Sequence, residues 1–178
     1  MKSVLAVALV HGLVLTQASA PLGPTVAGLD FEGVIISGDA LNRSKPNGPR
    51  ALPSAWTPTE ADVREAEGQV ADYLASSEVE ALVRGSRIRS ELANYKRQYW
   101  GVVRDGQREL LMSFIHASTS IVASGQWRTI GILAQGGGDE VYPVSTGIFV
   151  NGGFDKFFRV SYGVKSKRFS RLQINDAI

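Results

Sequence analysis

Apolar positions divide the chain into a helical part followed by a strand-rich part. A helix start is predicted at Thr57–Glu60, where a threonine N-cap, a proline at the first helical position and a later glutamate satisfy the first free amide groups. A second capping pattern at Ser77–Glu80 predicts another short helix that Gly85 ends or kinks, and helix resumes near Ile88–Leu92. The first helix carries an apolar stripe at helical spacing, which consists of Val63, Ala66, Val70, Tyr73 and Leu74.

From Tyr95 onward the apolar period changes to two, which is typical of strands. The segment Tyr95–Arg104 predicts a strand, Asp105-Gly106 a two-residue hairpin turn with positive φ, and Glu109–Ala117 the returning strand. Further strands are predicted within Ile121–Gln135, Val144–Val150, Lys156–Val164 and Arg168–Ile174. Within each strand, alternate apolar residues lie on the same face. One such set is Leu110, Met112 and Phe114, and another is Phe158, Val160 and Tyr162.

This order of elements predicts an α+β domain. An N-terminal helix packs on one face of an antiparallel meander of four to six strands, and the opposite face is polar and exposed. The domain is expected to span residues 57–178.

The chain before the helix has two parts. Residues 1–20 combine a charged head, the apolar run Val4–Leu15 and a small-x-small end, which is typical of a signal peptide cleaved after Ala20. The run is shorter than the roughly 20 residues that span a bilayer, so no stable membrane anchor is expected after cleavage. Residues 21–56 are proline-rich and indicate a linker or an ordered surface arm, with one short strand within Leu29–Ser37. The expected location is therefore the periplasm or the extracellular space.

Amino-acid composition excludes several kinds of function. Hydrophobic residues make up 44% and charged residues 20% of the chain, as in ordinary globular proteins. There is no cysteine, which excludes disulfides, thiolate nucleophiles and cysteine metal sites. The formal net charge of +2 provides no overall attraction to nucleic acid. Basic and aromatic residues interleave over Lys156–Arg171, and we interpret the aromatic side chains as core and the basic ones as solubilising a sheet edge.

Two stretches carry a resemblance to a known group of proteins. They are Tyr95–Gly106 (YKRQYWGVVRDG), and Gly152–Tyr162 (GGFDKFFRVSY) with Phe169–Leu172 and Asn175. They resemble small exported bacterial proteins of unknown function that share a helix, a Y-x-R-Q-Y-x-G strand, a hairpin, a tryptophan and a G-G-x-x-x-F-x-V-x-Y strand. The resemblance covers residues 57–178 and implies a cystatin-like α+β fold without an activity. Gln126–Val150 is longer and richer in glycine than in that group, and the Q-x-V-x-G loop of cystatins is absent.

Candidate chemistry is sparse. His116 is the single histidine after the leader, so a Ser–His–acid triad would have to include it, with Ser113, Ser118 and Ser120 close in sequence. No nucleophile elbow of the form G-x-S-x-G occurs. The carboxylate pair Asp139-Glu140 follows three glycines and is interpreted as a solvated turn. We assign no catalytic, cofactor-binding or metal-binding residues.

Arg97 and Gln98 say more about a possible binding surface than the residues considered for catalysis. Adjacent strand residues point to opposite faces, so one of them faces the helix. A buried arginine requires a carboxylate partner, and the acidic helix offers several. The candidate ligand or partner surface consists of Arg97, Gln98, Trp100, Asp139 and Glu140.

The sequence therefore favours an exported binding or interaction module that acts on a ligand or an envelope protein without catalysis. Two alternatives remain open, an exported hydrolase that uses carboxylates or His116, and a structural or assembly partner in the envelope.

Overall fold

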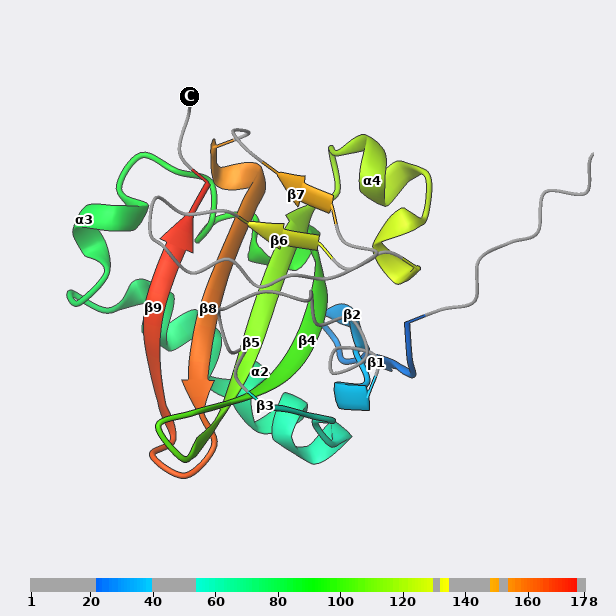
Figure 1. The fold of residues 1–178 in the computed structure, drawn as a ribbon. Coiled ribbons are helices and arrows are strands. Elements are labelled where there is room, and N and C mark those ends of the chain that lie inside the picture. The colour runs from blue at the N-terminus through cyan, green and yellow to red at the C-terminus, as the bar shows by residue number, and fades with distance from the viewer. Residues whose placement is uncertain (1–21, 40–53, 130–131, 135–147, 151–153, 176–178) are drawn as a thin grey trace, which may run out of the picture.

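The computed structural model describes residues 22–39, 54–129, 132–134, 148–150 and 154–175, and shows an α+β architecture (Figure 1). The predicted leader and the candidate residues Asp139 and Glu140 lie outside these ranges. The main sheet has seven strands: β1 (Thr25–Ala27), β2 (Glu32–Ile35), β3 (Ser54–Trp56), β4 (Tyr95–Arg104), β5 (Gln107–His116), β8 (Phe157–Gly163) and β9 (Arg168–Ile174). A second sheet pairs β6 (Ile132–Ala134) with β7 (Ile148–Val150) in parallel.

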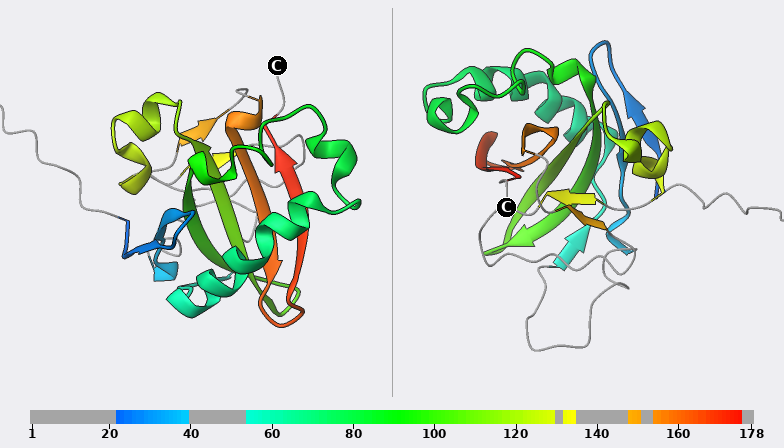
Figure 2. Two further views of the ribbon diagram at one scale, coloured as in Figure 1. Left: turned by 180° about the vertical axis from the view of Figure 1, so that it is seen from behind. Right: turned by 90° about the horizontal axis from the view of Figure 1, so that it is seen from above.

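Helical segments connect these strands. They are α2 (Glu60–Ala75), α3 (Glu80–Val83) and α4 (Ser120–Ala123), with the 3-10 turns η1 (Leu92–Asn94), η2 (Gln126–Arg128) and η3 (Phe154–Lys156). Helix α2 crosses one face of the main sheet, and β6 and β7 lie over the other face (Figures 1 and 2).

The main sheet differs from the expected meander. Its strand order is β1-β2-β4-β5-β8-β9, with β3 also paired to β4. The path from β4 to β9 is antiparallel as expected, but β2 runs parallel to β4 and residues 117–156 separate β5 from β8. Three strands precede α2, so the helix is not N-terminal in the sheet-forming part of the chain. The α+β class is confirmed, whereas the four-to-six-stranded antiparallel description is too simple.

The central hairpin matches the sequence prediction closely. Strand β4 has the predicted bounds, and β5 begins two residues earlier than expected. Asp105 and Gly106 have φ of 49° and 71°, the double positive φ that a two-residue turn of this type requires. The last strand, β9, also has its predicted bounds.

The segment before α2 supplies the other edge of the sheet. Strand β2 pairs with the first half of β4, where Glu32 faces Lys96, and β3 pairs with the second half, where Trp56 faces Gly101. A Cβ at position 101 would collide with the Trp56 backbone, so glycine permits this close approach. Strand β2 confirms the strand expected within residues 29–37, whereas β1 and β3 were not expected.

Helix α2 begins two residues later than predicted. The Thr59 hydroxyl accepts a hydrogen bond from the Asp62 amide at 3.2 Å, and the Asp62 carboxylate accepts one from the Thr59 amide at 2.9 Å. The Thr57 hydroxyl instead accepts a hydrogen bond from the Gly38 amide at 3.0 Å, which ties the segment after β2 to the start of the helix. The predicted apolar stripe is confirmed, with Val63, Ala66, Val70 and Leu74 buried.

Other local predictions were confirmed only in part. Ser77 does not cap α3, which follows Val79 without a side-chain cap and ends before Gly85 at φ 78°. No helix resumes over residues 88–91, which form turns before η1. Of the described residues within 121–135, β6 forms the expected strand, whereas Ser120–Ala123 form the short helix α4, which Thr119 caps by accepting a hydrogen bond from the Val122 amide. Strand β7 confirms the end of the segment expected at 144–150.

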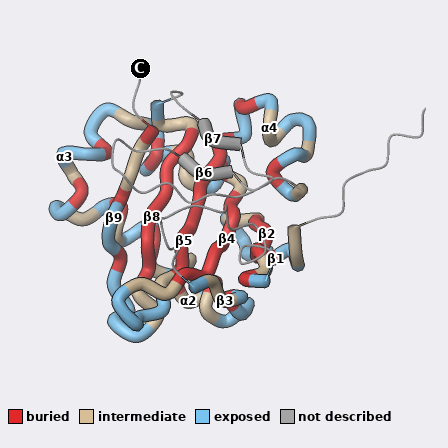
Figure 3. Tube along the Cα trace, in the orientation of Figure 1, coloured by how far each residue is buried: buried red, intermediate tan, exposed pale blue. Residues whose placement is uncertain are grey.

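Both faces of the main sheet are buried. On the face toward α2, the rings of Phe114 and Phe158 stack with centroids 4.2 Å apart, and Tyr162 joins the same cluster. The opposite face buries Trp100 and Trp127 in two further clusters. The expectation of an exposed polar face was therefore wrong, and the central strands are buried along most of their length (Figure 3).

Candidate functional site

Arg97 and Gln98 face opposite sides of the sheet. Arg97 points toward α2, where its Nε lies 3.3 Å from the Glu67 carboxylate. Gln98 points away, and its Nε2 donates to the Trp127 carbonyl at 2.6 Å. The expectation that a buried arginine would find a carboxylate on the acidic helix is confirmed, and Glu67 is that carboxylate.

The Glu67–Arg97 pair is almost completely buried. Exposed fractions of the two side chains are 4% and 2%. Glu67 Oε1 also accepts a hydrogen bond from the Tyr99 hydroxyl at 2.8 Å. Burial raises the pKa of Glu67, and the Arg97 charge and the Tyr99 hydrogen bond only partly oppose it. Burial and the neighbouring Glu67 carboxylate together raise the pKa of the Tyr99 phenol.

The Arg97 guanidinium is held from several directions. Its Nη1 donates to the Tyr95 carbonyl and its Nη2 to the Leu92 carbonyl, the latter at 3.1 Å. The group also lies 5.3 Å from the ring centroid of Phe114 and 5.8 Å from that of Phe31. Its Nε is buried and has no hydrogen-bond acceptor among the described residues, because the contact with Glu67 is not aligned as a hydrogen bond. An unsatisfied buried donor costs about 1–3 kcal/mol, which makes this nitrogen a candidate ligand contact.

A pocket of about 600 Å³ reaches this pair. Its walls are the β1–β2 turn (residues 28–31), one side of α2 and the connector at residues 89–93, and Glu67 and Arg97 belong to its lining. We call it the Arg97 pocket. Gly68 contributes open space, since a Cβ built there would meet nothing within 4 Å. The volume lies in the range of small-molecule sites.

Two further arginines line the Arg97 pocket. Arg64 Nη2 donates to the Ala27 carbonyl at 3.1 Å, and the same nitrogen lies 2.6 Å from the Glu60 carboxylate. Arg89 Nη1 lies 2.6 Å from the Glu80 carboxylate. Each guanidinium is therefore oriented by the protein before any ligand arrives.

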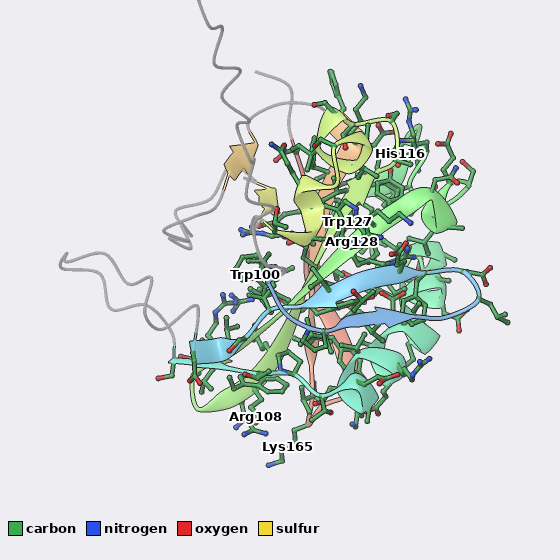
Figure 4. All side chains as sticks on the ribbon, turned by 90° about the vertical axis from the view of Figure 1, so that its right-hand side faces the viewer. Trp100, Arg108, His116, Trp127, Arg128 and Lys165 are labelled. Carbon is green, nitrogen blue, oxygen red and sulfur yellow. The ribbon has the colours of Figure 1, made fainter. Side chains whose placement is uncertain are left out.

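A larger cleft of about 1090 Å³ lies between the C-terminal half of α2 and the ends of the two hairpins. Asp72 and Glu78 line it on the helical side, and Arg108 and Lys165 on the hairpin side. Figure 4 shows Arg108 and Lys165 together at one end of the sheet, with His116 at the other. None of the residues that line this cleft has a buried polar atom without a partner. We therefore take the Arg97 pocket as the candidate site.

Gln98 and Trp100 do not share a surface with Arg97. Both are buried on the opposite face, where Trp100 packs with Ile36, Val102 and Leu111. The predicted set of five residues is thus divided: Arg97 lines the pocket, Gln98 and Trp100 are core residues of the other face, and Asp139 and Glu140 lie outside the described residues.

His116 has two side-chain partners. Its Nε2 lies 2.7 Å from Glu91 Oε2, and its Nδ1 lies 2.8 Å from the Ser118 hydroxyl. The Ser118 amide also donates to Nδ1 at 3.2 Å, so Nδ1 is the acceptor and Nε2 carries the proton toward Glu91. Ser118 is exposed, and these three residues line neither of the two clefts described above.

Sequence reasoning missed Glu67 and the pocket. A signal for Glu67 existed, because it is a carboxylate next to Ala66 and four residues after Val63 on the buried side of the helix. The pocket had no such signal, because its walls come from segments that are distant in the chain.

The described residues hold no group of three or more His, Cys, Asp or Glu side chains that could bind one metal ion. No helix within the described ranges is long and apolar enough to cross a bilayer. Comparison of the chain with protein-family models, with curated proteins and with solved structures gives no match.

Proposed function

We propose that this chain is an exported binding module that holds a small ligand in the Arg97 pocket. The observation that carries this proposal is that Arg97 lines the pocket while its buried Nε, beside Glu67, has no aligned hydrogen-bond acceptor in the described part of the chain. A ligand atom that accepted this hydrogen bond would remove the desolvation penalty of the donor. A rigid, partly charged base beneath partly apolar walls is typical of a ligand site.

One feature of the sequence supports export, and one feature of the fold supports the cystatin-like relationship. Residues 1–20 have the pattern of a cleaved signal peptide. Helix α2 on the antiparallel strands β4, β5, β8 and β9 is the arrangement that the resemblance to small exported proteins implies. Export and the cystatin-like relationship are therefore part of the proposal.

A fragment screen by ligand-observed NMR tests the binding function. The wild-type protein is compared with Gly68→Leu, which fills the open space in the pocket, and with Ala61→Leu, which adds a similar side chain to an exposed position of α2 outside the pocket. We expect fragments that bind the wild type and Ala61→Leu at millimolar concentration and fail to bind Gly68→Leu. Fragments that bind all three proteins equally, or no binding at all, would refute the proposal.

The contacts of His116 support a second candidate, a hydrolase. Hydrogen bonds connect Ser118 to His116 and His116 to Glu91, the same order as the nucleophile, base and acid of a catalytic triad. In this function Ser118 Oγ attacks an ester carbonyl and its proton moves to His116 Nδ1, while Glu91 stabilises the imidazolium. The ester C–O bond then breaks, the imidazolium returns the proton to the leaving alcohol, and water hydrolyses the acyl-serine by the same route.

Labelling with a fluorophosphonate probe tests this second candidate. Phosphonylation of Ser118 in the wild type, and its loss in His116→Ala and Ser118→Ala, is the expected result, read by mass spectrometry. Labelling that does not depend on His116, or no labelling, would show that the three residues only stabilise the loop after β5.

A further inference from the structure

We infer that the ligand of the Arg97 pocket is an organic anion, a carboxylate carried on an apolar body. This inference rests on the proposed binding function and specifies its ligand class. It follows from three properties of the pocket: the guanidinium at its base, the arginines of its lining and the apolar walls.

The donor at the base suits a carboxylate. Arg97 directs Nη1 and Nη2 to the carbonyls of Tyr95 and Leu92, which fixes the plane of the guanidinium and leaves its Nε without an acceptor among the described residues. Phe31 and Phe114 further restrict the orientation of this plane. A charge-assisted hydrogen bond from a fixed guanidinium to a carboxylate is stronger than one to a neutral carbonyl, so the geometry favours an anionic acceptor.

The lining contains more guanidinium groups than carboxylates. Three arginines, Arg64, Arg89 and Arg97, face two acids, Asp30 and Glu67. The acid at the base is already engaged, because one Glu67 oxygen accepts the Tyr99 hydroxyl and contacts Arg97. Glu60 and Glu80, which lie outside the lining, pair with Arg64 and Arg89 and largely balance their charge, so Arg97 is the principal contact for an anion.

The walls suit an apolar body. Leu29 is fully exposed at the tip of the β1–β2 turn, and Phe31 and Leu92 are partly buried. A ligand with an aliphatic or aromatic body would cover these side chains, while its carboxylate reached Arg97. A small inorganic anion would leave the apolar walls uncovered and is not the expected ligand.

The experiment compares matched ligands that differ only in their charge. Straight-chain carboxylic acids of four to ten carbons, their primary amides and the corresponding amines are titrated into the full chain and followed by protein-observed NMR. We expect the best acid to bind at least tenfold more tightly than its amide, and the amine to bind more weakly than both.

Variants assign the selectivity to the pocket. Gly68→Leu is expected to abolish binding of the acid. The double variant Arg64→Gln/Arg89→Gln is expected to weaken acid binding at least threefold while leaving amide binding unchanged. Lys165→Gln removes a charge from the larger cleft and is the control that should have no effect.

The outcomes separate the inference from the proposed function. If amides or amines bind as tightly as the acids, and Gly68→Leu blocks them, the anion inference is overturned and the binding function stands. The same holds if only fragments without a carboxylate bind. If nothing in the series or the fragment screen binds in a way that Gly68→Leu removes, the proposed function itself fails.

Discussion

Removal of the Arg97 charge tests how the buried ion pair contributes to stability. The substitution Arg97→Met keeps much of the side-chain volume but removes the positive charge beside Glu67, whose carboxylate is then buried without its counter-charge. It also removes the donors that satisfy the carbonyls of Tyr95 and Leu92. We expect a loss of about 3–5 kcal/mol in the free energy of unfolding at pH 8, which is typical when one partner of a buried pair is removed.

The structure indicates which interactions contribute to this loss of stability. Two lost hydrogen bonds contribute about 1 kcal/mol each, and every further unit by which the pKa of Glu67 rises contributes about 1.4 kcal/mol at a pH where the carboxylate would be charged. Burial already raises this pKa in the wild type, and without Arg97 the principal opposing effect is gone. The loss should therefore depend on pH.

The direction of that dependence follows from linkage. A carboxyl whose folded-state pKa is raised contributes stability that is present below its ordinary pKa of 4.5 and is lost as the pH rises through the folded-state value. Arg97→Met should therefore cost less at pH 5, where Glu67 can hold a proton, than at pH 8. The double variant Arg97→Met/Glu67→Gln places no charge at the site, so it should be more stable than Arg97→Met at pH 8 and should lack this pH dependence.

Urea unfolding at pH 5, 6.5 and 8, followed by the fluorescence of the three tryptophans, measures these differences. Arg64→Met is the matched control, because Arg64 pairs with Glu60 on the surface and its side chain is 50% exposed. Loss of such a pair costs at most about 1 kcal/mol. Equal losses for Arg97→Met at pH 5 and pH 8, together with additive effects in the double variant, would refute the reasoning.

Three other substitutions test separate parts of the structure. Gly68→Ala should raise the free energy of unfolding by about 0.5–1 kcal/mol and increase the melting temperature, because alanine favours the helix and a Cβ there meets no neighbour. Phe158→Ala should lower it by about 3–5 kcal/mol in urea unfolding, because the ring is fully buried in the core; an unchanged midpoint would show that this assignment is wrong. Glu32→Gln should destabilise fully above about pH 4.5 and progressively less below it in pH-dependent unfolding: the Lys96 hydrogen bond, with a smaller effect from Arg128, lowers the pKa of Glu32, so the wild type loses this stability as the pH falls through the folded-state value.

The central part of the fold could be predicted because its local signals are strong. Strand β4 and the Asp105-Gly106 turn combine a clear period of two with the residues that a positive φ requires. The stripe on α2 is equally clear. Strands β1 and β3 have only three residues each, too few for a recognisable period, and pairing with partners far along the chain determines their conformation.

The buried second face illustrates another limit. Strand β5 is apolar at both sets of alternate positions, including Leu111 and Ile115. Such a run indicates burial on two sides, but the segments that contribute Val34 and Trp127 to that face lie far from β5 in sequence or in short helical turns. The predicted ligand surface is divided between two faces for the same reason. Alternation correctly separates Arg97 from Gln98, yet nothing local shows that Gln98 and Trp100 are also covered.

The resemblance motif acquires a physical explanation from β4. Its tyrosines and arginine, Tyr95, Arg97 and Tyr99, alternate along one strand and face α2, where Arg97 and Tyr99 both contact Glu67. The intervening glutamine points away, and Gly101 leaves room for the Trp56 backbone. These strand residues therefore supply the strand side of the contact with α2, and Glu67 on the helix completes the buried ion pair.

The pocket needs more than this motif. One wall is the β1–β2 turn, and β2 reaches its place only by pairing in parallel with β4 at Glu32–Lys96. These residues precede the segment 57–178 that carries the resemblance. Without the β1–β2 hairpin the Arg97 pocket would lose the wall that contains Leu29 and Phe31. In the proposed function, ligand selectivity therefore depends on the segment that precedes the helix as well as on the buried pair.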